Sequence, residues 1–227
     1  MHSNSRWRLL AALPIVFALG GCGTTVLLDK FDAAPIGATP AQPATGSSTV
    51  SGSAVIAANP QNADSTDRWL RLSRPSATAP GGEYIGSFTQ NLSKSKASVD
   101  LVGFIPSSSP IMMTVFFEPR APLPAIPLMH IDLLTNGNIS VNDSQVIGTF
   151  KFDTLVGFFI NFDLTGSSPT ASILIRGGAN DASTSVSVPV NAANFGLGRV
   201  RIVAPFEGVN APNGSFLVNE LVAIKPN

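Results

Sequence analysis

The sequence predicts an all-β protein in which two antiparallel sheets pack as a jelly-roll sandwich. Short runs rich in Val, Ile, Leu and Phe alternate with polar residues and are separated by turn residues. The chain has 20 Gly, 18 Pro and only 12% charged residues, a composition typical of many short strands joined by turns. We find no helix-period segment of ten residues or more and no internal repeat.

The centre of the expected sheet lies between residues 127 and 178. An alternating strand at 128–134 is followed by Asn136-Gly137, which we expect to supply the two positive-φ residues of a tight hairpin. After a turn at 142–144, the run 156–164 places an apolar residue at every second position, and the strand at 171–176 follows. These segments predict an antiparallel meander.

The remaining expected strands bring the total to roughly a dozen. They are residues 24–31, 54–57, 68–73, 84–89, 97–105, 111–118, 183–188, 199–204 and 216–224. The pair 54–57 and 68–73 is expected to form a hairpin, and 111–118 is apolar on both faces, which indicates a central strand. Residues 33–53 and 119–127 are rich in Pro and are expected to be irregular connections.

The N-terminus has the features of a targeting segment. Arg6 and Arg8 precede an apolar run at residues 9–19, and the tetrapeptide Leu-Gly-Gly-Cys ends at Cys22. The apolar run is too short for a membrane-spanning helix. The tetrapeptide resembles the lipobox of bacterial lipoproteins, in which the cysteine is lipidated after the preceding peptide is removed.

This resemblance implies a signal peptide at residues 1–21 and a lipid anchor on Cys22, with one β-sandwich domain at 22–227. The anchor implies a bacterial cell envelope protein attached to the membrane through acyl chains such as palmitate. Gly23 is not the aspartate that resembles an inner-membrane retention signal, so we expect the outer membrane. Because the first strand begins at Thr24, the domain is expected to lie close to the bilayer.

The net charge argues against nucleic-acid binding, and the cysteine content argues against disulfide bonds. The chain has 14 basic and 14 acidic residues, and removal of residues 1–21, which contain two arginines and no acidic residue, leaves a net charge of −2. Binding to nucleic acid is therefore not expected. Cys22 is the only cysteine, so no disulfide is expected, and stability must come from burial of the 44% hydrophobic residues.

A second resemblance covers most of the mature chain. The segment Phe-Asp-Ala-Ala-Pro-Ile-Gly-Ala-Thr-Pro at 31–40 resembles the opening of concanavalin A-like and laminin-G-like sandwiches, and residues 132–138, 156–176 and 214–224 resemble their later strands. This resemblance implies that the first and last strands lie side by side. It also implies binding of a glycan or of an envelope protein.

Enzyme activity on this fold would need paired catalytic groups. No two of the fourteen acidic residues are two or four positions apart, so the strand-borne carboxylate pair of a glycosidase is not found in the sequence. Polysaccharide lyases on jelly-roll folds use a strand histidine with a tyrosine and an arginine. The alternative enzyme is therefore lyase-like and uses His130, Arg71 and Tyr84, which would have to line one groove.

Three further sets of residues are candidate or competing sites. His130 and Asp132 should share one strand face, as catalytic residues or simply as polar members of a half-solvated face. Trp69 and Arg71 also share a face and could bind a sugar, although Trp69 could instead be packed in the core. Pairing of the terminal strands would also bring together the possible calcium ligands, namely Asp29, Asp32, Asn219 and Glu220.

We therefore expect a cell-envelope lipoprotein with a non-catalytic sandwich that binds a glycan or an envelope protein through residues such as Trp69 and Arg71. The alternatives are the lyase-like enzyme and a purely structural envelope domain. No cofactor other than the possible calcium ion is expected.

Overall fold

The computed structural model describes residues 23–76, 79–204 and 214–227, and the predicted lipidation site Cys22 lies outside them. The elements of this part of the chain are β1 (Thr24–Asp29), β2 (Ser47–Ser51), β3 (Ser53–Ala58), β4 (Arg68–Ser73), β5 (Glu83–Leu92), β6 (Lys96–Phe104), β7 (Met113–Glu118), β8 (Met129–Leu133), β9 (Asn138–Val141), β10 (Gln145–Thr149), β11 (Leu155–Asp163), β12 (Thr170–Arg176), β13 (Ala182–Ser187), α1 (Val190–Phe195), β14 (Leu197–Val203) and β15 (Ser215–Lys225). None of the described helices is long and apolar enough to cross a membrane.

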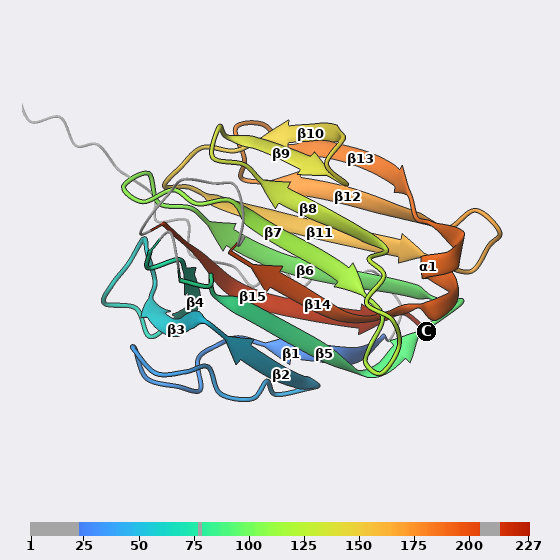
Figure 1. The fold of residues 1–227 in the computed structure, drawn as a ribbon, viewed down its shortest axis with the longest axis horizontal. Helices are drawn as coiled ribbons and strands as arrows, with labels where there is room; N and C mark the ends of the chain where they lie inside the picture. Colours follow the sequence, from blue (N-terminus) through green and yellow to red (C-terminus); the bar gives the residue numbers. More distant parts are fainter. Residues whose placement is uncertain (1–22, 77–78, 205–213) are drawn as a thin grey trace, which may run out of the picture.

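The strands form two antiparallel sheets that overlie one another (Figure 1). The eight-stranded sheet has the order β13-β12-β11-β6-β15-β4-β3, with β1 also pairing with β15. The seven-stranded sheet has the order β10-β9-β8-β7-β14-β5-β2, so β7 is central, as its apolar faces predicted. The predicted all-β sandwich is therefore confirmed.

The core lies between the two sheets and is built from every second side chain of each strand. In β11, Val156, Phe158, Ile160 and Phe162 are all buried, as the alternation predicted. The ring of Phe162 lies 5.4 Å from that of Phe117 on the opposite sheet, which shows that the two inner faces interdigitate. Full burial of each such side chain contributes about 1.5 to 3 kcal/mol.

The first and last strands pair, as the resemblance to concanavalin A-like sandwiches implied. Thr24 lies opposite Lys225, and Asp29 lies opposite Leu221. Both chain ends of the described domain are therefore at the same end of the sandwich. The connection from Leu92 to Lys96 lies at this end too, because Ser98 in β6 pairs with Ile224.

The turn at Asn136-Gly137 does not have the predicted pair of positive-φ residues. Gly137 has a φ of 85°, but Asn136 instead accepts a hydrogen bond from the Asn138 N–H at 3.0 Å, and the predicted positive-φ pair was wrong there. The pair occurs one turn later, where Asn142 and Asp143 have φ values of 51° and 58°. These left-handed conformations are better tolerated by Asn and Asp than by most residues.

The structure adds two strands that the sequence did not predict. Residues 33–53 were expected to be irregular, but they include β2, which pairs with β5. Residues 145–149 form β10, which pairs with β9. Both strands are at the edges of the seven-stranded sheet.

Candidate functional site

The outer face of the seven-stranded sheet carries polar side chains that alternate with the core. In β8, Met129, Ile131 and Leu133 are buried on the inner side, so His130 and Asp132 point to the outer face. Strand β7 pairs with β8 so that Phe116 lies opposite His130 and Thr114 opposite Asp132. This shared face was predicted for His130 and Asp132, and it forms one side of a groove.

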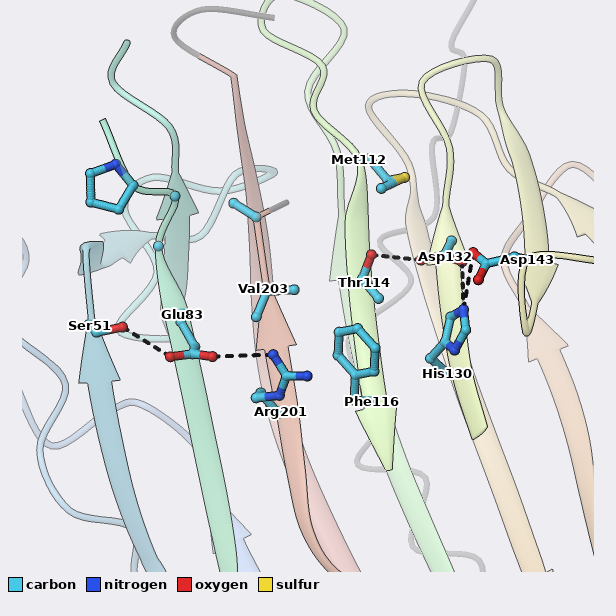
Figure 2. Close-up of a pocket in the computed structure, with 14 residues that line it drawn as sticks. Ser51, Glu83, Met112, Thr114, Phe116, His130, Asp132, Asp143, Arg201 and Val203 are labelled. Carbon is cyan, nitrogen blue, oxygen red and sulfur yellow. Dashed lines mark hydrogen bonds and ion pairs between the residues drawn. The ribbon is translucent and has the colours of Figure 1, made fainter. Parts of the chain in front are cut away.

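The groove has a volume of about 770 Å³ and crosses β8, β7, β14, β5 and the end of β2 (Figure 2). Its outline is completed by loop residues before β5 and after β14. The lining residues are Ser51, Pro80, Gly81, Gly82, Glu83, Met112, Thr114, Phe116, His130, Asp132, Asp143, Arg201, Val203 and Ala204.

One wall of the groove is an imidazole between two carboxylates. The Nε2 atom of His130 lies 3.5 Å from the Oδ2 atom of Asp132 and 3.3 Å from the Oδ1 atom of Asp143. Asp143 reaches His130 from the turn between β9 and β10, and its side chain is 85% exposed. We call His130, Asp132 and Asp143 the histidine–aspartate trio.

Asp132 is held in place by its neighbours. Its Oδ1 atom accepts a hydrogen bond of 2.6 Å from the Thr114 hydroxyl, and its side chain is only 5% exposed. Burial raises the pKa of Asp132, while the hydrogen bond from Thr114 and the charge of His130 act in the opposite direction. A fixed, buried carboxylate beside an exposed one gives the wall a rigid part and an adaptable part.

The opposite wall is organised by Arg201. Its guanidinium carbon lies 4.0 Å from the centroid of the Phe116 ring, a cation–π contact. Its Nη1 atom lies 3.4 Å from Glu83 Oε1, and the hydroxyl of Ser51 donates a hydrogen bond of 3.1 Å to the same carboxylate. The Phe116 ring in turn lies 5.4 Å from the ring of His130, so it separates the two walls.

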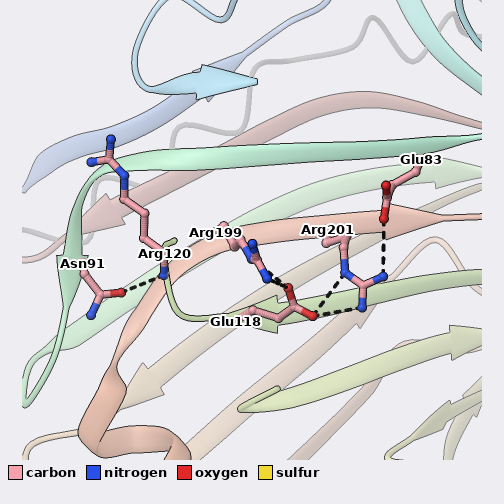
Figure 3. Close-up of polar contacts among 6 residues, drawn as sticks. All are labelled: Glu83, Asn91, Glu118, Arg120, Arg199 and Arg201. Carbon is pink, nitrogen blue, oxygen red and sulfur yellow. Dashed lines mark hydrogen bonds and ion pairs between the residues drawn. The ribbon is translucent and has the colours of Figure 1, made fainter. Parts of the chain in front are cut away.

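On the same outer face as Arg201, Glu118 is an anchor for two guanidinium groups (Figure 3). The Oε2 atom of Glu118 accepts a hydrogen bond from Arg199 Nε at 2.8 Å. Its Oε1 atom accepts hydrogen bonds from Arg201 Nε at 3.1 Å and Nη2 at 3.0 Å. The Glu118 side chain is fully buried, so these bonds fix the position of Arg201 in the groove.

The histidine–aspartate trio is also the group of side chains that could hold a metal ion in the described part of the chain. One ligand atom from each of the three residues lies within 4.8 Å of the other two. One imidazole and two carboxylates form a donor set that Zn²⁺ or Mn²⁺ accepts. The same three groups can alternatively accept hydrogen bonds from a ligand.

Comparison with solved structures identifies the fold. A lectin from Bauhinia forficata in complex with GalNAc has a TM-score of 0.54 at 11% identity, covering 90% of this chain and 99% of its own. An endo-1,3-beta-glucanase from Streptomyces sioyaensis has a TM-score of 0.53 at 11% identity, with coverage of 90% and 97%. The chain has the lectin-like jelly-roll fold. No family model and no curated protein matches the sequence.

The lectin-like fold does not bring together the three residues of the lyase-like alternative. His130 lines the groove, but Arg71 is exposed on β4 in the other sheet. Tyr84 is fully buried in the core. The predicted single groove shared by the three residues is therefore not formed, because alternation along β5 turns Tyr84 inward.

Trp69 is packed rather than displayed. It is 2% exposed and packs against Ala57, Phe104 and Leu217 in a small cluster, while its Nε1–H donates a hydrogen bond of 2.9 Å to Asp67. Its ring therefore offers no open face to a sugar, in line with the alternative that it is a core residue. Arg71, its expected partner in ligand binding, remains exposed on the same strand.

The four predicted calcium ligands have separate partners. Asp32 accepts a hydrogen bond from the Arg68 N–H at 2.9 Å, and the Asn219 amide donates to Asp67 at 2.9 Å. Glu220 lies 4.0 Å from the Lys30 ammonium. Asp29 is turned into the core. These separate partners do not support calcium binding by the four residues, which stays a prediction.

Asp29 and Tyr84 form a buried pair that ties β1 to the seven-stranded sheet. The Tyr84 hydroxyl donates a hydrogen bond of 2.6 Å to Asp29 Oδ2, and the Phe31 N–H donates one of 3.0 Å to Oδ1. Burial raises the pKa of Asp29. Burial also raises the pKa of Tyr84, and the Asp29 charge adds to this shift.

Replacing Tyr84 by Phe is expected to lower the free energy of unfolding by about 1 to 2 kcal/mol, because it leaves the Asp29 carboxylate with one partner fewer in the core. Urea denaturation at pH 7 measures the change. The matched control is the same substitution in an Asp29→Asn background, where the cost should be smaller. An equal cost in both backgrounds would show that the hydroxyl contributes independently of Asp29.

Sequence reasoning missed Phe116, Glu118 and Arg201. These residues come from β7 and β14, which become neighbours only through strand pairing, and Glu118 and Arg201 are 83 positions apart in the chain. The alternation of Arg199, Val200, Arg201 and Ile202 is a signal that two arginines share one face of a strand. It does not reveal which carboxylate lies opposite them.

Proposed function

We propose that this protein is a lipid-anchored protein of the bacterial cell envelope whose sandwich binds a carbohydrate in the groove of the seven-stranded sheet, without catalysis. The observation that carries the proposal is the groove itself, which places fixed polar groups on both sides of the Phe116 ring. Small-ligand sites combine such an apolar surface with a few convergent polar groups.

The polar groups of the groove suit a ligand with many hydroxyl groups. Glu83, Asp132 and Asp143 present carboxylate oxygens, which accept hydrogen bonds, and the main chain of Gly81 and Gly82 approaches the groove closely. A Cβ atom on Gly81 would lie 2.1 Å from the Ala204 carbonyl oxygen, so this wall is tightly packed. Asp132 and Glu83 are held by their own partners, and preset acceptors of this kind bind a ligand with a small entropic cost.

The positions of the carboxylates support binding rather than hydrolysis. Glu83 and Asp132 are separated by β14 and β7, which places their backbones roughly 14 Å apart at 4.8 Å per strand, so their side chains would have to lean toward each other to reach the carboxyl spacing of a glycosidase pair. Asp132 and Asp143 are closer together, but both face the same nitrogen of His130.

The groove lies at the end of the sandwich opposite the proposed lipid anchor. Glu83 is the first residue of β5 and Val203 the last of β14, whereas Leu92 and Leu197 pair at the other ends of these strands. Gly23 lies at that other end, next to Lys225. A lipid on Cys22 would therefore hold the sandwich with the groove toward the end that is far from the membrane.

Thermal denaturation of the full chain in detergent, with and without neutral, amine-bearing and anionic oligosaccharides, tests the proposal. A ligand that binds only the folded state stabilises it by about 2.7 kcal/mol at one hundred times its Kd. We expect a shift with one class of oligosaccharide, and Phe116→Ala should weaken binding at least tenfold. The matched control is Phe159→Ala on the other sheet, which should bind normally.

A shift that Phe116→Ala leaves unchanged would contradict the groove as the site. An absence of any shift across the three classes would contradict carbohydrate binding and favour an envelope protein as the partner. Release of reducing ends or of unsaturated products during incubation would show that the groove is catalytic.

A further inference from the structure

The groove contains more ionisable acids than free bases. Among the residues that the structure describes, its charged side chains are Glu83, Asp132, Asp143, His130 and Arg201. Three of the five carry a negative charge when ionised. The charge of the groove therefore depends on whether its one arginine is available to a ligand.

Arg201 is not available, because all three of its nitrogen atoms face carboxylates. Its Nε and Nη2 atoms donate to Glu118, and its Nη1 atom faces Glu83. One face of the guanidinium group is covered by the Phe116 ring. Together, Arg199 and Arg201 offset the charges of Glu118 and Glu83, so this wall is close to neutral.

The opposite wall is negative. In the histidine–aspartate trio, Asp132 and Asp143 carry two negative charges when ionised, and a protonated His130 offsets only one of them. The His130 side chain is 17% exposed, so the ring is recessed, and the exposed carboxylate of Asp143 is the group that a ligand meets first. A cation is attracted to this wall, and an anion is repelled.

We propose that the carbohydrate bound in the groove carries amine groups, as an amino sugar with a free amine does. This inference rests on the proposed function. An ammonium group donates hydrogen bonds to the carboxylate of Asp143 on its exposed side, while the sugar ring lies over the Phe116 and His130 rings beside it. Uronates and sulfated or phosphorylated glycans are rejected, which also argues against the lyase-like alternative.

A matched pair of oligosaccharides tests the inference. Isothermal titration of the full chain in detergent compares a β-1,4-linked glucosamine hexamer, which carries free amines, with the N-acetylglucosamine hexamer, which is neutral. We expect at least tenfold tighter binding of the glucosamine hexamer at low salt, and a smaller preference at 0.5 M NaCl because salt screens the exposed charges. An oligogalacturonate is expected not to bind.

Asp143→Asn removes one negative charge without changing the shape of the side chain, and Asn tolerates the left-handed conformation of this position. It should abolish most of the preference for the glucosamine hexamer, because removal of the charge weakens binding of that hexamer more than binding of the neutral N-acetyl hexamer. Asp64→Asn, an exposed aspartate that does not line the groove, is the control and should retain the preference.

Equal affinity for the two hexamers would overturn the charge preference while the proposed carbohydrate binding stands. A preference that persists in Asp143→Asn would also overturn it, because the amines would then bind elsewhere. Binding of neither hexamer nor any other oligosaccharide would overturn the proposed function together with this inference.

Discussion

Replacing Glu118 by Gln is expected to lower the free energy of unfolding by about 3 kcal/mol, because removal of one partner from a buried ion pair leaves uncompensated charge. The Glu118 side chain is fully buried, and the side chains of Arg199 and Arg201 are 15% and 27% exposed. A neutral amide keeps the shape but cannot offset two guanidinium charges. Urea denaturation of the wild type and the variant, with shared m-values, measures the difference.

The matched control for this prediction is Asp181→Asn. Asp181 forms an ion pair with Arg176 in which both side chains are about half exposed, and such exposed pairs add little to stability. If the Glu118 variant lost no more stability than the Asp181 variant, the buried network would not be what holds Arg199 and Arg201. The Glu118 variant should also lose affinity for an amine-bearing ligand in the groove, since Glu118 would no longer offset the charge of Arg201.

The parts of the fold that the sequence predicted are those with strong alternation. The inner positions of β11 are all large and apolar, so the strand and its buried face follow from the pattern alone. The pairing of β3 with β4 likewise follows from two apolar runs around one polar loop. In these segments the local pattern and the packing require the same conformation.

The two missed strands have a common physical reason. Both β2 and β10 are edge strands, and most of their residues are exposed or half-buried. Ser47–Ser51 contains four hydroxyl residues and one valine, so it has no apolar face for a pattern to reveal. Hydrogen bonding to β5 holds β2 in place, and such pairing cannot be read from one strand.

The site was predictable only where its residues share one strand. His130 and Asp132 are two positions apart, so alternation placed them on one face. Asp143 joins them through the turn after β9, and Arg201 through the pairing of β14 with β7. Alternation within single strands could not show whether His130, Arg71 and Tyr84 line one groove, because each is on a different strand. Arg71 is on the other sheet, and Tyr84 is on the inner face.

The second large effect on the free energy of unfolding is expected from replacing Asp100. It lies on the outer face of the eight-stranded sheet, opposite Phe159 in β11 and Val222 in β15. Burial raises its pKa to about 6, and the charge of Glu220 adds to the shift. Since the unfolded chain has a pKa near the ordinary 3.8, the folded state binds this proton more tightly.

The sign of the pH effect follows from that difference. Below about pH 4 Asp100 is protonated in both states and costs nothing, whereas above about pH 6 the ionised group destabilises the folded state. Asp100→Asn should therefore raise the free energy of unfolding by about 1 to 2 kcal/mol at pH 7, after allowance for the screening of a half-buried group. At pH 4 it should change little.

Urea denaturation of wild type and Asp100→Asn at pH 4 and at pH 7 provides the measurement, and the difference between the two pH values is the quantity of interest. Asp64→Asn, an exposed aspartate, should give the same small change at both. A gain for Asp100→Asn that is equal at pH 4 and pH 7 would mean that the amide packs better than the acid, and that ionisation of Asp100 is not the source of the instability. A gain confined to pH 7 would identify Asp100 as a carboxylate kept on this face at a cost in stability.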